Sequence, residues 1–479
     1  MGRYDIIIIG SGAGGCAAAY HLTQTGARVL LLEKGEALPR DGSTLDPERV
    51  MGKGEFLSRE PWRDGEGREI LPEEHFNLGG KTKWYGAALL RFDPTEFAED
   101  PARRCLAWPI AYADLAPFYE EAERLLAVQT FPPEPDITRL AAGLARRDAG
   151  WQSQGLALGL SPDILTQPQE ASHFDGFASV LGLKADAEQA LLGRIAHMPN
   201  LALRTGCPVR RLLGDGRRVT GVECADGSRH HAGTVVLAAG ALHSPRLLQD
   251  YLAESGLDRE LPGSNLVGRH YKSHILTALL AFSSRPVTDV LGKTLLLLHR
   301  DSPASSVQTL GGSLGADIAS RQMPGFVPGW IRSGVACRAY GFFLQTEDGS
   351  HPDNRVLAAH GGRPQLDYNA ARLPGALGEH TRLVAKLRRD LLGLGYVAFS
   401  QRIGVTGTAH ACGTLVTGTR PETSVVDPEG RVWGLENLYV ADGSVLPRSS
   451  RVNPALTIYA WGLRVASLLA GHRELTHGA

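Results

Sequence analysis

The chain has 479 residues, of which 43% are hydrophobic and 57 are glycine. This length and composition are those of a globular protein with two substantial cores, and they exclude a disordered chain. The 50 basic and 51 acidic residues leave a formal net charge of -1. Because the chain carries no strong basic field, we expect neither nucleic acid nor a membrane surface as a partner.

The six cysteines are scattered along the sequence and form no C-x-x-C pair. This spacing predicts neither a zinc site nor a disulfide framework, so we expect no metal and reduced thiols. The first predicted strand begins almost at the N-terminus, which leaves no space for a secretory signal, and no apolar run approaches the length of a membrane span. We therefore expect a cytoplasmic protein.

The N-terminal residues predict a strand, a glycine turn and a helix in immediate succession. Residues 4–9 form a continuous, mostly β-branched run that is typical of a buried parallel strand. In the G-x-G-x-x-G turn that follows, Gly10 permits a tight bend, Gly12 lets phosphate approach the backbone and Gly15 lets the helix pack on the strand. The helix is expected to end near Gly26.

A second buried strand is predicted at residues 27–33, and it ends in Glu33. An acid at this position can accept a hydrogen bond from a ribose hydroxyl, and it disfavours a 2′-phosphate because two anions would repel each other. Strand, turn, helix, strand and acid together predict a dinucleotide-binding unit. At this point FAD and NAD both fit.

The chain after Glu33 is rich in glycine and proline, and we expect little regular structure there. A second glycine turn lies at residues 77–86, and apolar residues at spacings of three and four predict an amphipathic helix over residues 112–126. Four more strands are predicted from short apolar runs between turns, at residues 201–204, 209–212, 219–223 and 234–241.

The block from about residue 265 to residue 395 has a different pattern. Strand-like stretches at residues 275–282 and 338–345 alternate with turns, and one helix is predicted at residues 376–392. We interpret this block as the substrate-binding domain.

Several motifs, taken in order, resemble the glucose-methanol-choline (GMC) oxidoreductases. They are the N-terminal glycine fingerprint, the Gly79-Gly80 turn, A-G-A-x-x-S-P-x-L-L at residues 239–248, H-x-x-G-T at residues 410–414, and D-G-S followed by N-P between residues 442 and 454. The resemblance covers essentially the whole chain.

The resemblance implies an α/β protein with a Rossmann-type FAD-binding domain and an interleaved α+β substrate-binding domain on an antiparallel sheet. The FAD-binding domain is expected in three parts, residues 1–100, 191–264 and 401–479, the last with the catalytic residues. Residues 101–190 are expected to be a helical and loop segment that contributes to the substrate domain. The substrate domain itself is expected at residues 265–400.

By resemblance the cofactor is FAD. The residues expected to bind it are Gly10, Gly12, Ala13, Gly14, Gly15, Glu33, Lys34, Gly79, Gly80, Val209, Ala239, Gly240, Asp442, Gly443, Asn453, Ala455 and Leu456. Some relatives carry a histidine covalently linked to flavin in the second glycine turn, but residues 79–85 contain none, so we expect non-covalent FAD. Lys81 and Lys83 occupy this segment, and at least one of them is expected to be solvated.

Oxidation of an alcohol by flavin needs a base for the hydroxyl proton, and a histidine suits that task. His410 has the family position of this base, and Asn453 has that of its partner. Because a carboxamide is not a base at neutral pH, His410 is expected to take the proton and Asn453 to orient the substrate oxygen. Asn453 is also expected to cap a helix that starts at Pro454, whose free amides at Ala455 and Leu456 would face the reduced flavin.

The substrate is not encoded in any motif. The resemblance favours a secondary alcohol of a sugar or glycoside, with a non-sugar or aryl alcohol, or non-redox lyase or isomerase chemistry, as alternatives. Molecular oxygen and another electron acceptor both remain open, as does the oligomeric state. Cys412 is expected to be a small buried side chain. Aromatic residues that could stack on a ring are Trp84, Tyr85, Tyr340, Phe342 and Phe343.

Overall fold

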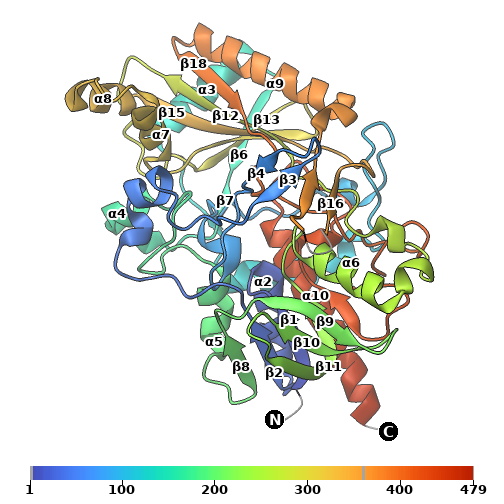
Figure 1. Ribbon diagram of the computed structural model, residues 1–479. Helices are drawn as coiled ribbons and strands as arrows, with labels where there is room; N and C mark the ends of the chain where they lie inside the picture. The colour runs from blue at the N-terminus through green and yellow to red at the C-terminus, as the bar shows by residue number, and fades with distance from the viewer. Residues whose placement is uncertain (1–3, 359–361, 478–479) are drawn as a thin grey trace.

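Parallel strands form the core layer of the nucleotide-binding half. The computed structural model describes residues 4–358 and 362–477. The parallel strands are β1 (Tyr4–Ile9), β2 (Val29–Leu32), β8 (Leu201–Arg204), β11 (Arg229–Leu237) and β19 (Leu438–Val440). Their order is β8-β2-β1-β11-β19, and helix α1 (Ala13–Gln24) connects β1 to β2 (Figure 1). The predicted Rossmann-type unit is confirmed.

Two hairpin strands extend this sheet at one edge. Strands β9 (Val209–Gly214) and β10 (Val219–Cys224) are antiparallel to each other, and β10 pairs with the first half of β11. The predicted strands at residues 209–212 and 219–223 are therefore confirmed. The strand predicted at residues 234–241 ends earlier, at Leu237, because the chain turns through Gly240 (φ +82°) into helix α6 (Ser244–Ser255).

The second half of the molecule is built on an antiparallel sheet of six strands. These are β6 (Trp151–Gly155), β12 (Ile275–Phe282), β13 (Leu295–His299), β14 (Ser305–Thr309), β15 (Ala339–Thr346) and β18 (Val397–Arg402). Their order is β18-β12-β15-β14-β13-β6, and every neighbouring pair is antiparallel. The predicted antiparallel substrate-domain sheet is confirmed.

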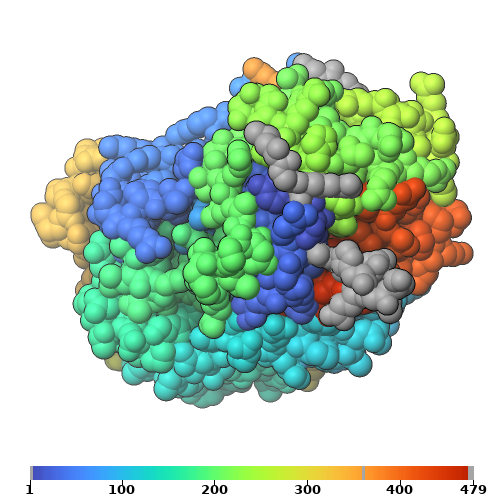
Figure 2. All heavy atoms as spheres, turned by 90° about the horizontal axis from the view of Figure 1, so that it is seen from below, coloured from blue at the N-terminus to red at the C-terminus, as the bar shows by residue number. Residues whose placement is uncertain are grey.

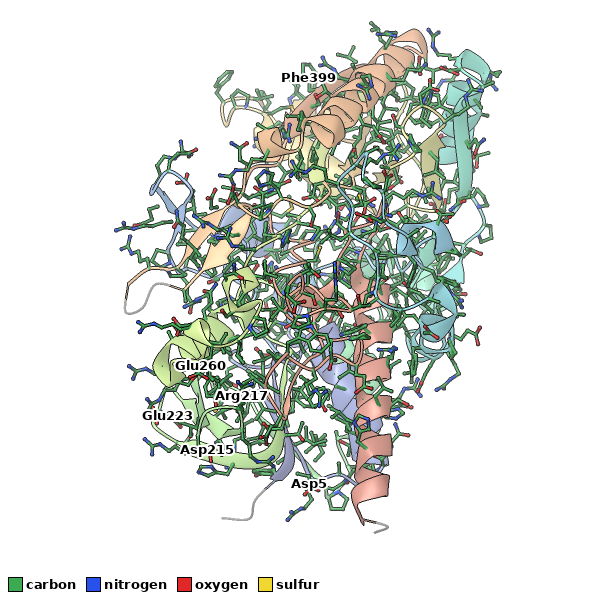
Figure 3. The ribbon with its side chains drawn as sticks, turned by 90° about the vertical axis from the view of Figure 1, so that its right-hand side faces the viewer. Asp5, Asp215, Arg217, Glu223, Glu260 and Phe399 are labelled. Carbon is green, nitrogen blue, oxygen red and sulfur yellow. The ribbon has the colours of Figure 1, made fainter. Side chains whose placement is uncertain are left out.

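Helices cover one face of this sheet. Helix α9 (Pro374–Gly393) and helix α3 (Pro135–Arg147) bury leucines at helical spacing against the strands, among them Leu383, Leu387 and Leu391 of α9. Phe399 of β18 and Asp5 of β1 lie toward opposite ends of the molecule (Figure 3).

The prediction of a single helix in this half is wrong. Besides α9, the chain forms α7 (Leu314–Gln322) and α8 (Gly329–Ala336). Both helices contain glycine, which lowers helix propensity, and both are short. Tertiary packing of Ala319 and Ala336 against Leu280 stabilises them, and the local sequence does not encode that contact.

Small sheets connect segments from different predicted domains. Strands β3 (Trp62–Asp64), β4 (Glu69–Ile70), β16 (Arg355–Leu357) and β17 (Gln365–Asp367) form one of them, in the order β16-β17-β3-β4, and β5 (Gln129–Thr130) pairs with β7 (Ala157–Leu158). The other short helices are α4 (Pro168–Ser172) and α5 (Gly193–Ile195). The boundary predicted at residue 400 falls inside β18, which ends at Arg402.

Short 3-10 and π turns also punctuate the loops. They are η1 (Ser43–Leu45), η2 (Glu48–Gly52), η3 (Gly80–Lys83), η4 (Pro94–Phe97), η5 (Pro162–Thr166), η6 (Glu188–Leu192), η7 (Leu257–Arg259), η8 (Ser264–Leu266), η9 (Ala370–Arg372) and η10 (Gly443–Val445).

The two ends of the chain pack against each other. The C-terminal helix α10 (Ala455–His477) runs beside α1, and in Figure 2 blue N-terminal atoms lie near orange-red C-terminal ones. The approach is close, because a Cβ added to Gly462 would lie 2.6 Å from the Gly14 carbonyl oxygen. Helix α2 (Tyr112–Leu125), which confirms the predicted amphipathic helix, packs on α10. None of the helices in the described ranges is long and apolar enough to cross a membrane.

Buried carboxylates hold the segment that leads into α10. Arg448 donates hydrogen bonds of 2.8 and 2.6 Å to the two oxygens of Glu347, and only 6% and 1% of these side chains are exposed. The backbone amide of Ser450 donates to Glu347 at 3.2 Å, and that of Arg451 donates to Glu96 at 3.0 Å. These contacts come from distant parts of the chain, so they fix residues 448–451 against the rest of the protein.

Arg448→Met should lower the free energy of unfolding by about 3–5 kcal/mol, because it leaves the Glu347 carboxylate buried without a cation. Arg218→Met is the matched control, since the Arg218–Glu436 ion pair is 46% and 58% exposed and is worth about 1 kcal/mol or less. Denaturant unfolding of both variants measures the difference. Equal losses would contradict the structural role given to the Arg448–Glu347 pair.

Candidate active site

A cavity of about 1020 Å³ lies between the two halves and is lined by residues from both. It contains most of the residues predicted to bind the cofactor or to catalyse: Gly10, Gly12, Ala13, Gly14, Glu33, Lys34, Gly80, Val209, Ala239, Gly240, His410, Asp442, Gly443, Asn453 and Ala455. Gly15, Gly79 and Leu456 were predicted with them but do not line its wall. Leu456 is fully buried in the core.

The start of α1 forms one end of the cavity and has the features of a phosphate site. Gly12 precedes the helix, no side chain caps its free amides, and a Cβ on Gly12 would meet no atom within 4 Å. At Gly15 a Cβ would lie 1.9 Å from the Gly10 carbonyl oxygen, so this glycine serves helix packing. The cradle left open at Gly12 fits a pyrophosphate, as the sequence predicts.

Two buried acids organise the loops at this end. Glu33 accepts hydrogen bonds from the amide of Ser11 (2.9 Å) and from that of Gly35 (2.9 Å). Asp442 accepts from the amide of Gly240 at 2.8 Å, and burial raises its pKa while its hydrogen bonds oppose that rise. Glu33 therefore joins the first glycine turn to the end of β2, and Asp442 joins the turn at Gly240 to the segment after β19.

Lys34 lies on the same wall. It forms an ion pair with Glu60, and its ammonium lies 3.7 Å from the centroid of the Phe76 ring. Burial lowers its pKa.

His410 and Asn453 meet on another part of the wall. The Asn453 carboxamide nitrogen lies 3.3 Å from His410 Nε2, and the carboxamide oxygen accepts a hydrogen bond from Gln308 of β14. The Gln308 contact fixes which end of the amide faces the imidazole. The ring of Phe343 contacts His410 edge to face, with centroids 6.0 Å apart. The structure therefore brings together the two predicted catalytic residues, 43 positions apart in the chain.

A second histidine, His274, sets the protonation pattern of His410. His274 Nε2 lies 2.8 Å from the Ser450 carbonyl oxygen, which only accepts, so this nitrogen carries the hydrogen. In neutral His274 the Nδ1 atom is then an acceptor, and it lies 3.2 Å from His410 Nδ1. His410 must donate from Nδ1, so its Nε2 lone pair accepts from the Asn453 amide on the cavity wall.

The surroundings keep His410 neutral. Burial, followed by the charges of His274, Lys293 and Lys81, holds its pKa well below the usual value of 6.5. Burial also lowers the pKa of His274. A neutral imidazole with an exposed Nε2 lone pair is the form that a general base needs.

The capping arrangement predicted at α10 is wrong. The Pro454 carbonyl accepts the first bond of the helix, from the Ile458 amide at 3.0 Å, and α10 begins at Ala455. The Asn453 side chain instead binds His410 and Gln308. The demands of the site outweigh the ordinary preference of Asn for an N-cap. Ala455 lies on the cavity wall, so the positive end of α10 faces the cavity.

Neither lysine of the second glycine turn is freely solvated, contrary to the prediction for at least one of them. Lys83 is buried and pairs with Asp186 (3.0 Å) and Glu188 (2.6 Å). Lys81 lines the cavity, pairs with Glu74 and donates to the Thr408 carbonyl at 2.8 Å. Each lysine ammonium is paired with at least one carboxylate, which offsets the cost of removing the charge from water.

The remaining predicted positions divide between wall and core. Cys412 is fully buried, as expected, and burial raises its pKa to about 12. Trp84, Tyr85 and Phe343 line the cavity, whereas Tyr340 and Phe342 belong to the core of the six-stranded sheet.

Sequence reasoning missed His274 and Gln308, which hold His410 and Asn453. It also missed the buried ion pair of Lys293 with Asp175 (2.6 Å), which lines the same cavity. All of these belong to segments without a motif, and only the pairing of distant strands brings them to the site. The φ of +60° at His274 is unusual for a histidine, but it is not visible in the sequence.

Comparisons with known proteins agree with this geometry. Residues 387–462 match the family described as GMC oxidoreductase, and residues 5–262 match the family described as FAD dependent oxidoreductase. The chain is 31% identical to a 6'''-hydroxyparomomycin C oxidase from Streptomyces lividus, over 98% of this chain and 92% of the relative. It is 32% identical to a paromamine 6'-oxidase from Streptomyces fradiae, over 99% and 93%.

A solved structure with the same fold is pyridoxine 4-oxidase from Mesorbium loti. Its TM-score is 0.70 at 20% sequence identity, and the alignment covers 98% of this chain and 100% of that one.

Gly12→Val should yield folded protein without FAD, because the new side chain would occupy the open cradle and meets no protein atom at its Cβ. Gly325→Val is the control, since a Cβ there also meets nothing within 4 Å but the residue is exposed and away from the cavity. Flavin absorbance per polypeptide measures the result. A yellow Gly12→Val protein would place the cofactor elsewhere.

Proposed function

The chain belongs to the GMC family of FAD-dependent oxidoreductases, which act on alcohols, and we propose that it oxidises a primary alcohol of an aminoglycoside to the aldehyde. The pairing of His410 with Asn453 on the cavity wall carries this proposal, because it supplies a base and a donor for one substrate oxygen. Two relatives above 30% identity are named for oxidation of paromomycin-type compounds, which supports the aminoglycoside class.

The proposed position differs from the secondary alcohol favoured in the sequence analysis. The names of both relatives specify a 6-position, and in a hexose this carbon is the exocyclic CH₂OH group. A hydroxymethyl group projects from the sugar ring, so it can reach a base in a deep cavity while the ring remains nearer the entrance.

The charges on the cavity wall suit an amino sugar. Glu33, Glu60, Glu74, Asp175 and Asp442 line the wall, and each has a hydrogen-bond or ion-pair partner. The Glu73 carboxylate also lies on the wall, and among the described residues it makes no hydrogen bond or ion pair. We propose that it receives an ammonium group of the substrate, because this exposed carboxylate attracts a cation that enters the cavity.

The residues at the site divide the work of the reaction. The substrate oxygen is expected to lie between His410 Nε2 and the Asn453 amide, accepting a hydrogen bond from the amide and donating its own to the imidazole. His410 takes the hydroxyl proton as the C–H bond breaks and the C=O bond forms. Bound FAD supplies the acceptor for the hydride. His410 returns its proton to solvent in a later step.

We propose that His274 is a positioning residue for this base. Its Nδ1 accepts the His410 Nδ1 hydrogen, so the lone pair of His410 stays on Nε2, where the substrate binds. When His410 takes up the proton, neutral His274 continues to accept from the imidazolium and stabilises it. The Ser450 carbonyl, held through the Glu347 network, fixes His274 in turn.

FAD is proposed to be non-covalent and molecular oxygen to be the electron acceptor. The absence of histidine from residues 79–85 supports the first statement, and the names of the two oxidases support the second. We also propose a cytoplasmic location, which fits six cysteines that form no disulfide.

Mixing the purified protein with an amine-bearing glycoside under anaerobic conditions should bleach the flavin band, and air should restore it quickly. A neutral glycoside with the same hydroxymethyl group should bleach it only at higher concentration, because it lacks the partner for Glu73. Acid precipitation should release all the flavin. No bleaching by any alcohol would refute alcohol oxidation, and slow recovery in air would indicate another acceptor.

His410→Ala, as the matched variant, should keep its flavin but lose about 10²- to 10⁴-fold in the rate of flavin reduction. The wild-type rate should stay constant as pH falls through 6.5, because the lowered pKa keeps His410 neutral there, and should decline only at lower pH. Stopped-flow reduction across pH measures both effects. A rate that halves near pH 6.5 would contradict the lowered pKa.

His274→Leu should reduce the rate of flavin reduction by about 10- to 100-fold, because His410 loses the acceptor that fixes its tautomer. His274→Asn should recover most of the rate, since its carboxamide oxygen can accept the same hydrogen and Asn tolerates the φ of +60° at this position. Flavin content should be similar in both variants, whereas His274→Leu should unfold at a lower temperature, because leucine rarely adopts a φ of +60°. Equal rates in the two variants would exclude the tautomer role.

A further inference from the structure

Two cysteines and a histidine from consecutive strands or their ends meet beside the cavity. Cys207 and Cys224 have their sulfurs 2.9 Å apart, and one ligand atom from each of Cys207, Cys224 and His230 lies within 4.8 Å of the others. All three are buried, with exposed fractions of 9%, 1% and 6%. The GMC chemistry proposed above uses none of them.

The three side chains are held on a rigid scaffold. Cys224 ends β10, His230 is in β11 and Cys207 lies just before β9, so the cluster is at one end of the antiparallel β9-β10-β11 unit. Glu223, the neighbour of Cys224, lies at the outer edge of the molecule (Figure 3) and pairs with Arg211 and Arg229. Because successive strand residues point to opposite faces, Cys224 points inward.

We propose that Cys207, Cys224 and His230 form a structural site for a zinc-like divalent cation, with water as the fourth ligand. Two thiolates and one imidazole are a ligand set that zinc prefers. A divalent cation with two thiolates and a neutral imidazole has no net charge, so the buried position does not carry the cost of an isolated ion. Metal would cross-link three strands beside Val209, which lines the cofactor cavity.

The present geometry needs only a small adjustment to bind the ion. Zinc–sulfur bonds of about 2.3 Å place two tetrahedral ligands about 3.8 Å apart, so the sulfurs would separate by roughly 1 Å. The Cys207 thiol donates a hydrogen bond to Cys224 Sγ at the shorter separation of 2.9 Å. Cys207 lines the cavity, which provides the entry path for the ion.

The test is metal binding by the reduced flavoprotein, stripped with chelator and then titrated with cobalt(II). Tetrahedral thiolate coordination should produce cobalt d–d absorption at wavelengths beyond the flavin bands, saturating at one equivalent, and zinc should displace it and raise the unfolding temperature. Cys207→Ser and Cys224→Ser should each abolish the signal. Cys337→Ser should keep it, because Cys337 is an exposed, isolated thiol.

Two outcomes would overturn the site. The first is absence of a saturable cobalt signal in reduced wild type that carries its full flavin. The second is a signal that survives both Cys207→Ser and Cys224→Ser. Since the measurement does not involve turnover, it remains valid whatever the substrate is.

Discussion

The buried pair of Arg448 with Glu347 is the contact on which the active site depends. Glu347 follows β15 of the antiparallel sheet, and Arg448 lies between β19 of the parallel sheet and α10. The pair therefore joins the two halves of the molecule at the segment that leads to Asn453. A buried pair that is hydrogen-bonded at both carboxylate oxygens tolerates little displacement, because each partner would be left as a buried charge.

Several further bonds converge on the same short segment. The Arg451 carbonyl accepts from Ser306 and Gln345, and the Ser450 hydroxyl donates to Glu96. Gln308, which holds the Asn453 amide, is two residues from Ser306 in β14, so both point to the same face of that strand. The antiparallel sheet of the substrate domain thus fixes the position of the segment that contains Arg451 and Asn453 in the other domain.

This alignment supports the role of general base that is proposed for His410. The Ser450 carbonyl accepts a hydrogen bond from His274 Nε2, so the hydrogen of neutral His274 is on that nitrogen. His274 Nδ1 then accepts from His410 Nδ1, and the lone pair of His410 is on Nε2, at the cavity wall. Lys293 and Lys81 add positive charge nearby, which disfavours protonation of His410 before substrate arrives. Orientation and protonation state are fixed by the same packed surroundings, and neither requires movement of the backbone.

The sequence by itself determined the local units, whose structure depends on residues that are consecutive or a few positions apart. The glycine turn between β1 and α1, the acid after β2, and helices α2 and α9 could be predicted, because each depends on backbone sterics or periodicity over a few positions. His410 was indicated by the resemblance of its H-x-x-G-T motif to that of the GMC family. Only the tertiary structure decided which side chains surround them. His274, Gln308 and Glu347 reach the site through strand pairing, α7 and α8 form against neighbours rather than by propensity, and Cys207 meets Cys224 without any motif spacing. Contacts between distant segments depend on the packing of whole sheets, and sequence patterns over a few residues do not specify that packing.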